Sequence, residues 1–297
     1  MTGNWIKRPE GGGRLALRLL SAIALSFGRV PARAIIYVVA LYFMLRRGPE
    51  RRASRAFLAR VFGRPATLLE GYRHVLRFSQ VTLDRIFLLH DGTRRFEVES
   101  TGLDDAHAMM ALNRGVLLFG AHFGSYEIMR VLSQRRPDLQ FRTVIDLEQA
   151  PAMSQLLGSL NPALAATVIN ARQSGPAVAL AIKDALDQRA AVTLLADRVR
   201  PGGRVIEADF LGARAPFPTA PWEIAAALGA PVVLCVGVYL GGNRYHLHFE
   251  IVAERIVRER NGGPPLSKWI QTFADRLAAR AVDAPYNWFN FYDFWAS

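Results

Sequence analysis

One short segment, residues 115–127 (GVLLFGAHFGSYE), restricts the fold more than any other part of this sequence. Its residues 116–119 are all apolar and lie between glycines, a pattern that predicts a strand buried on both faces of a parallel sheet. Ser125 follows at a position typical of a helix N-cap, ahead of apolar residues at helical spacing. The segment therefore predicts a strand, a tight turn and a helix, with His122 at the carboxyl end of the strand. Open α/β sheets bind their ligands at that edge.

The same alternation of short apolar runs and helical segments continues along the chain. Helices near 125–136, 151–159 and 175–188 separate the expected strands, which predicts right-handed crossovers within a mainly parallel sheet. A helical region at 49–89 precedes them, and an amphipathic helix at 266–282 follows. We expect an α/β fold, with a mainly parallel sheet flanked by helices. The expected strands are 94–99, 116–120, 141–145, 166–169 and 192–196, with more exposed strands at 204–210 and 244–252.

Basic residues are concentrated near the start of the chain. Residues 1–64 hold 13 of the 37 Lys and Arg but only two of the 25 Asp and Glu, and so carry +11 of the net charge of +12. The nearly neutral remainder argues against a nucleic-acid-binding protein. Two apolar stretches, 15–27 and 35–45, are shorter than the roughly 20 residues that span a bilayer. We expect 1–64 to form a helical segment lying in a membrane surface, its arginines reaching towards anionic lipid, and 65–297 to form the α/β domain.

Two arginines, Arg46 and Arg47, come directly after the second apolar stretch. Because basic residues tend to remain on the cytoplasmic side of a membrane, they predict that the α/β domain lies on that side. A pair of buried core helices beside a solvated basic flank is the alternative interpretation. The single Cys235 lies in an apolar run, which excludes an intrachain disulfide.

His122 and Glu127 are the strongest candidates for chemistry. The spacing places Glu127 in the first turn of the helix, where its carboxylate would accept a hydrogen bond from one imidazole nitrogen while the other faces the substrate. Such a carboxylate fixes the tautomer and stabilises the imidazolium that forms when the histidine takes a proton. From spacing alone, the alternative is a histidine that only supports the turn and a glutamate favoured by the helix dipole.

The segment GAHFGSYE resembles the His-x-x-x-x-Asp/Glu block of the bacterial lipid A biosynthesis acyltransferases, within the wider lysophospholipid acyltransferase-like superfamily. Two later segments extend the resemblance, LLADRVRPGG, which contains Asp197 and Arg198, and FLGARAPFPTAP. Together they cover residues 100–240. The resemblance implies a glycerolipid acyltransferase-like fold, in which His122 deprotonates an acceptor hydroxyl and Glu127 orients the imidazole.

The resemblance also implies substrates and binding residues. The donor would be a thioester of acyl carrier protein or coenzyme A, and the acceptor a lipid or other amphiphile at the bacterial inner membrane. The sequence has no Walker A loop and no Gly-x-Gly-x-x-Gly fingerprint, so we expect no nucleotide cofactor, and we also expect no metal or nucleic acid. Asp197 and Arg198 would position the acceptor or stabilise charge, and Arg172 would contact a phosphate. A structural Asp-Arg pair and a solvated surface arginine are the alternatives. A rigid apolar loop would form a wall for the acyl chain through Phe210, Gly212, Phe217 and Pro218.

The sequence departs from the lipid A enzymes in two places. Ala196-Asp197-Arg198 stands where those enzymes have a carboxylate-rich Asp-Gln-Asp block, and the aromatic ending 285–295 differs from theirs. Both features resemble the acyltransferases associated with aryl-polyene and xanthomonadin-type pigment lipids, and we expect the aromatic ending to dock into the core. The alternatives are a lipid A secondary acyltransferase proper, a serine-type lipid hydrolase that uses Ser125 with His122, and a noncatalytic lipid-binding protein.

Overall fold

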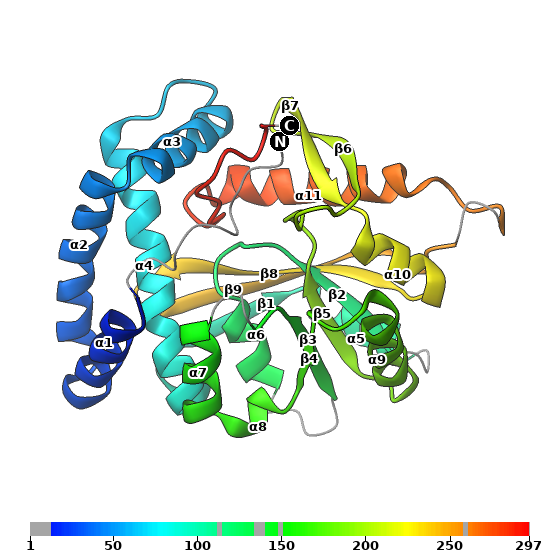
Figure 1. Ribbon diagram of the computed structural model, residues 1–297, viewed down its shortest axis with the longest axis horizontal. Coiled ribbons are helices and arrows are strands. Elements are labelled where there is room, and N and C mark those ends of the chain that lie inside the picture. The colour runs from blue at the N-terminus through cyan, green and yellow to red at the C-terminus, as the bar shows by residue number, and fades with distance from the viewer. Residues whose placement is uncertain (1–12, 112–114, 134–139, 148–150, 258–260, 297) are drawn as a thin grey trace.

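A seven-stranded sheet runs through the middle of the molecule, with helices on both faces (Figure 1). In sheet order its strands are β1 (Glu97–Thr101), β9 (Arg244–Ala253), β8 (Val232–Gly241), β2 (Val116–Gly120), β5 (Ala191–Leu195), β3 (Phe141–Ile145) and β4 (Val168–Asn170). Neighbouring strands are parallel except β8 and β9, which form an antiparallel hairpin. The computed structural model describes residues 13–111, 115–133, 140–147, 151–257 and 261–296.

Alternate side chains of the strands enter two cores, one on each face of the sheet. In β2, Leu117 and Phe119 enter the first core, whereas Val116 and Leu118 enter the second, as the two-residue period of a strand requires. The expected α/β fold with a mainly parallel sheet is confirmed. The first core lies under α9 (Gly175–Asp187), α10 (Ala220–Leu228) and α11 (Leu266–Asp283), and the second under α4 (Leu68–Asp91), α5 (Leu103–Ala111), α6 (Tyr126–Ser133), α7 (Pro151–Leu160) and α8 (Pro162–Ala165).

Most strand positions agree with those expected. Strands β2 and β3 have the expected bounds, and β1, β4, β5 and β9 begin and end within three residues of theirs. A short 3₁₀ helix, η2 (Gly92–Arg95), leads into β1 and displaces the start of that strand. Residues 134–136 of the helix expected near 125–136 lie outside the described residues.

The helical region expected at 49–89 consists of two helices, α3 (Gly48–Phe62) and α4. Gly63 ends α3 in the left-handed conformation, with φ of 64°. Thr67 then begins α4 with a capping box, in which its side chain accepts a hydrogen bond from the Glu70 backbone while the Glu70 carboxylate accepts one from the Thr67 backbone. The domain boundary expected at residue 64 thus falls in the short link between these helices.

Helix α3 contributes side chains to the first core. Its Phe57 and Leu58 are buried in the first core, beside side chains of the sheet and of α11. Two more helices, α1 (Gly13–Phe27) and α2 (Arg29–Arg46), lie next to α4 at one side of the sheet (Figure 1). The N-terminal helices are therefore packed onto the α/β body.

Helix α2 is apolar on two faces. Its buried face carries Ala32, Ile36, Ala40 and Met44 at four-residue spacing, the period of one helix face. Among the described residues, no helix is both long and apolar enough to cross a bilayer. The other face exposes large apolar or aromatic side chains, namely Val30, Tyr37, Val38, Leu41, Tyr42 and Leu45.

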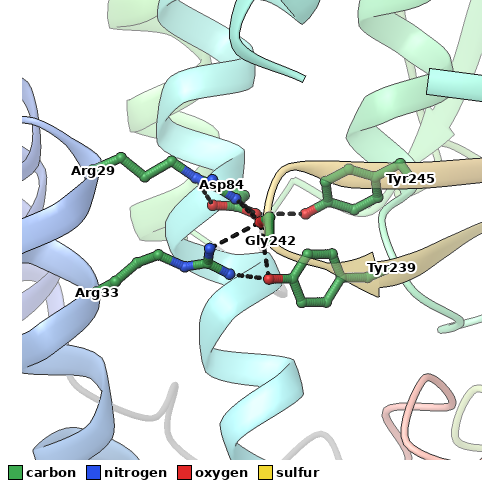
Figure 2. A network of polar contacts seen from close by, with 6 residues as sticks. All are labelled: Arg29, Arg33, Asp84, Tyr239, Gly242 and Tyr245. Carbon is green, nitrogen blue, oxygen red and sulfur yellow. Dashed lines mark hydrogen bonds and ion pairs between the residues drawn. The ribbon is translucent and has the colours of Figure 1, made fainter. Parts of the chain in front are cut away.

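Figure 2 shows how the beginning of α2 is held. Both carboxylate oxygens of Asp84, a fully buried residue of α4, accept hydrogen bonds of 2.7 Å from Arg29. The hydroxyl of Tyr245 donates to the same carboxylate at 2.9 Å, and Arg33 donates to the hydroxyl of Tyr239. Two of the arginines expected to reach towards lipid are thus bound within the protein. Arg29 pairs with Asp84 because a buried carboxylate requires a cationic partner.

Residues 213–218 form a strand and not the rigid loop that was expected. Strand β7 (Ala213–Pro218) pairs with β6 (Val205–Phe210) in an antiparallel hairpin, separate from the main sheet. Pro216 and Pro218 lack a backbone N–H, which argues against a central strand. A two-stranded ribbon tolerates them, because only one side of each strand is paired, and Ala215 and Phe217 are buried in the alternating pattern.

The C-terminal segment, residues 284–296, follows α11 and lies between α3 and the β6–β7 hairpin (Figure 1). Trp288 is fully buried and Phe294 is 2 % exposed, and both belong to the first core. The expectation that the aromatic ending docks into the core is confirmed.

Candidate functional site

His122 and Asp197 meet at the carboxyl edge of the sheet. Their strands are parallel neighbours, with Gly120 at the end of β2 opposite Leu195 at the end of β5. Two residues further on, the imidazole Nδ1 of His122 lies 2.9 Å from Oδ1 of Asp197. The backbone N–H of His122 also donates to Oδ2 of Asp197 at 2.9 Å. The loop that follows β2 and the loop that follows β5 are therefore joined through the carboxylate of Asp197.

The pair has the protonation states of a general base and its partner. Burial and the charge of Arg198 lower the pKa of His122, although the charge of Asp197 opposes them. Burial alone would raise the pKa of Asp197, but the charge and hydrogen bonds of His122 and the charge of Arg198 lower it to about 2. At neutral pH the imidazole is thus neutral and donates from Nδ1, which leaves Nε2 free to take a proton. The His122 side chain is 29 % exposed, so a substrate can reach it.

Glu127 has different partners from the one expected. Its carboxylate lies 3.0 Å from Nη1 of Arg130 and 3.3 Å from Nε of Arg85, while Asp197 occupies Nδ1 of His122. The expected hydrogen bond between His122 and Glu127 is therefore replaced by the one between His122 and Asp197. The physical reason is that a carboxylate is bound more strongly by two guanidinium groups than by a neutral imidazole. Arg85 nevertheless links Glu127 to the site, because its charge also lowers the pKa of His122.

The two expected basic residues, Arg198 and Arg172, lie at different distances from His122 along the carboxyl edge of the sheet. Arg198 follows Asp197 directly, and its Nη2 donates to the carbonyl oxygen of Phe289 at 2.8 Å. Arg172 follows β4, two strands beyond β5, and its Nε lies 3.4 Å from Asp146. The structure thus places Arg198 beside His122 and Arg172 further along the same edge.

The residues expected to form an acyl-chain wall lie in the β6–β7 hairpin. Phe210 and Phe217 are buried, and the ring of Phe210 packs 5.1 Å from that of Trp288. Pro218 is also buried, and Gly212 turns the hairpin with φ of 78°. The rings of Phe210 and Phe217 support the C-terminal segment of the protein itself, since both pack against the ring of Phe294.

The C-terminal segment contributes to the site in a way that the sequence did not reveal. The indole Nε1 of Trp288 donates to Oδ2 of Asp197 at 3.2 Å. The backbone N–H of Phe289 donates to the carbonyl oxygen of His122, and that of Gly124 to the carbonyl oxygen of Asn287, both at 2.7 Å. Trp288 and Asp197 are 91 residues apart, so no local pattern indicates their contact.

Two buried polar side chains near the loop have no hydrogen-bond partner among the described residues, the hydroxyl of Ser125 and the amide of Asn290. Ser125 directly precedes α6, where an N-cap was expected, yet its hydroxyl makes no cap hydrogen bond. Nearly all buried polar groups in folded proteins are paired.

Comparison with known proteins identifies the family of the chain. A family model described as bacterial lipid A biosynthesis acyltransferase matches residues 19–296, which include His122, Asp197 and the C-terminal segment. A comparison with curated proteins finds no match. The chain belongs to the bacterial lipid A biosynthesis acyltransferase family.

Proposed function

We propose that this protein transfers a fatty acyl chain from a thioester of acyl carrier protein or coenzyme A to a hydroxyl of a lipid or other amphiphilic acceptor. Membership of the family supports acyltransferase activity on a lipid. The observation that carries the chemistry is the partly exposed imidazole of His122, hydrogen-bonded through Nδ1 to the buried carboxylate of Asp197.

In the proposed reaction, Nε2 of His122 takes the proton of the acceptor hydroxyl as its oxygen attacks the thioester carbonyl. Asp197 stabilises the imidazolium that forms, and Arg198 stabilises the negative oxygen of the tetrahedral intermediate. When the intermediate collapses, the C–S bond breaks and His122 returns the proton to the leaving thiolate. The products are an ester and a free thiol.

Direct transfer is favoured over a covalent acyl-enzyme. A serine nucleophile requires a hydrogen bond between its hydroxyl and the base. Ser125 makes none with His122, and its side chain is only 1 % exposed. The geometry thus gives the serine hydrolase alternative no support.

We also propose that α1 and α2 dock the protein on the cytoplasmic face of the inner membrane. A surface helix normally presents polar side chains to water. Helix α2 instead exposes Val38, Leu41 and Leu45 at 50–69 %, and basic residues follow at its end. Such a face suits insertion into the headgroup region, with the arginines near anionic lipid.

The acceptor we propose is a polar or polyene-linked lipid, in preference to a tetra-acylated lipid A precursor. The two sequence departures that distinguish this chain lie against each other, because Arg198 binds the carbonyl of Phe289 and its guanidinium lies 5.6 Å from the ring centre of Tyr292. They therefore alter one part of the site together, whereas His122 serves chemistry common to both acceptors.

A competition experiment tests the proposed reaction and the proposed acceptor. Purified protein is given acyl carrier protein thioesters and the two acceptors in one reaction, which compares their kcat/KM values directly. We expect ester formation mainly on the polyene-type acceptor and its loss in His122→Ala. Preference for the lipid A precursor would overturn the acceptor, whereas equal activity of folded His122→Ala would overturn the mechanism.

A further inference from the structure

The buried carboxylate of Asp197 has two residues as its hydrogen-bond donors among those the structure describes. His122 donates from its imidazole to Oδ1 and from its backbone to Oδ2. Trp288 donates from its indole to Oδ2. Trp288 is thus the second side chain that fixes the carboxylate.

Trp288 is itself held on several sides. Its ring is fully buried, with ring centres 4.9 Å from Phe57 and 4.8 Å from Phe294. Its backbone forms an isolated antiparallel bridge with Phe123, next to His122. The indole N–H therefore approaches Asp197 from a rigid position.

A buried histidine fixes the backbone of Trp288. His74 of α4 is fully buried, and burial lowers its pKa to about 4, so it is neutral at pH 7. Its Nε2 lies 2.8 Å from the carbonyl oxygen of Trp288, which can only accept, so the proton is on Nε2. Nδ1 then accepts from the hydroxyl of Ser54 in α3 at 2.9 Å. Hydrogen bonds thus connect α3 and α4 with the backbone of the residue that binds Asp197.

We propose that Trp288 is a positioning residue for His122, acting through Asp197, and that His74 holds Trp288 in place for this role. The proposal rests on the proposed function, in which His122 is the base. Without the indole N–H, the carboxylate loses a donor, so its negative charge acts more strongly on the imidazole and raises the pKa of His122, while the imidazole is held less firmly in position. The other charged or titratable groups acting on the pair are Arg198, Arg85 and Tyr292.

The test compares Trp288→Phe with a matched control, Trp222→Phe. Trp222 is also fully buried, but its indole N–H has no hydrogen-bond partner among the described residues. We would follow the titration of the His122 imidazole by ¹⁵N NMR and the pH profile of kcat/KM. We expect Trp288→Phe to raise the pKa of His122 by about half a unit and to lower kcat/KM about tenfold. Trp222→Phe is expected to change neither, although both variants lose core contacts.

Equal titration curves and equal kcat/KM in the two variants would overturn the positioning role. If Trp288→Phe fails to fold, incorporation of 3-benzothienylalanine at position 288 keeps the ring shape without the N–H, and the same shift is expected. An unshifted pKa of His122 in the 3-benzothienylalanine variant would overturn the proposal. A shifted His122 titration in a protein without detectable acyl transfer would support the positioning role while the proposed reaction failed.

Discussion

At the scale of single residues, the two carboxylates near His122 have different effects on its protonation. Asp197→Asn removes the negative charge that raises the pKa of the imidazole, so the acid limb of kcat/KM should move to lower pH. The rate should also fall by about 10²–10⁴, because the base loses the group that orients it. Glu127→Gln leaves the partner of Nδ1 in place and should shift the limb less. Both pH profiles are measured; a larger shift for Glu127→Gln would contradict the pairing described here.

His74 predicts a pH dependence of stability. The pKa of His74 is about 4 in the folded protein and 6.5 in an unperturbed histidine. Between these two pH values, the imidazole is protonated in the unfolded chain but neutral in the native state. A group with a lowered native pKa contributes stability that is complete above the unfolded pKa and is lost as pH falls through the native value. The free energy of unfolding should therefore fall by roughly 3 kcal/mol between pH 7 and pH 4 on account of His74.

Urea unfolding at several pH values checks this prediction, with His74→Gln as the comparison. The amide of glutamine can still donate to the Trp288 carbonyl but does not titrate, so the curve should be flatter in the variant. Identical slopes in the two proteins would show that another group causes the loss of stability.

The sequence identified part of the site at this scale. His122 and Asp197 could be placed together because each follows a strand of a parallel sheet, and such strands end at one edge. Glu127 has one partner, Arg130, three residues on in the same helix. Its other partner, Arg85, could not be identified in the same way, because it comes from α4 and its approach depends on how that helix packs. The contribution of Trp288 depends on tertiary packing in the same way.

At the scale of secondary-structure elements, one buried ion pair joins the beginning of α2 to α4, in addition to the apolar packing of the two helices. Asp84→Asn should lower the free energy of unfolding by about 3–5 kcal/mol, because Arg29 would lose its charged partner while still partly buried. Asp187→Asn is the matched control, since its partner Lys183 is 53 % exposed and solvent screens the pair. Chemical denaturation should show no measurable change for the control. A similarly small effect of Asp84→Asn would mean that packing alone holds α2.

The elements themselves differed in how well the sequence predicted them. Strands β2 and β3 were both predicted at their observed bounds. In β2, a continuous apolar run between glycines marks the strand. Strand β7 was not recognised, because two prolines in six residues normally exclude pairing on both sides. Its hairpin needs pairing on one side only, and this depends on the position of the ribbon outside the main sheet.

At the scale of the whole molecule, the exposed apolar face of α2 predicts membrane binding. Val38→Glu or Leu45→Glu should each weaken binding to anionic vesicles about tenfold or more, because each removes one large apolar side chain that would be buried in lipid. Leu180→Glu is the control, because Leu180 is 58 % exposed but belongs to α9. Vesicle co-flotation measures the bound fraction, and high salt alone should leave most of the protein bound. Complete release by salt, or equal binding of the three variants, would contradict insertion of this face.

The order of synthesis gives the C-terminal segment a further consequence. Trp288 leaves the ribosome after every helix and strand that the structure describes, because it follows α11 in the sequence. Before that, Asp197 has no indole donor, and the loop of His122 lacks its backbone hydrogen bonds to Asn287 and Phe289. We therefore expect the nascent chain to remain inactive until residues 284–296 have left the ribosome, even if α1 and α2, which precede them in the sequence, have already reached the membrane.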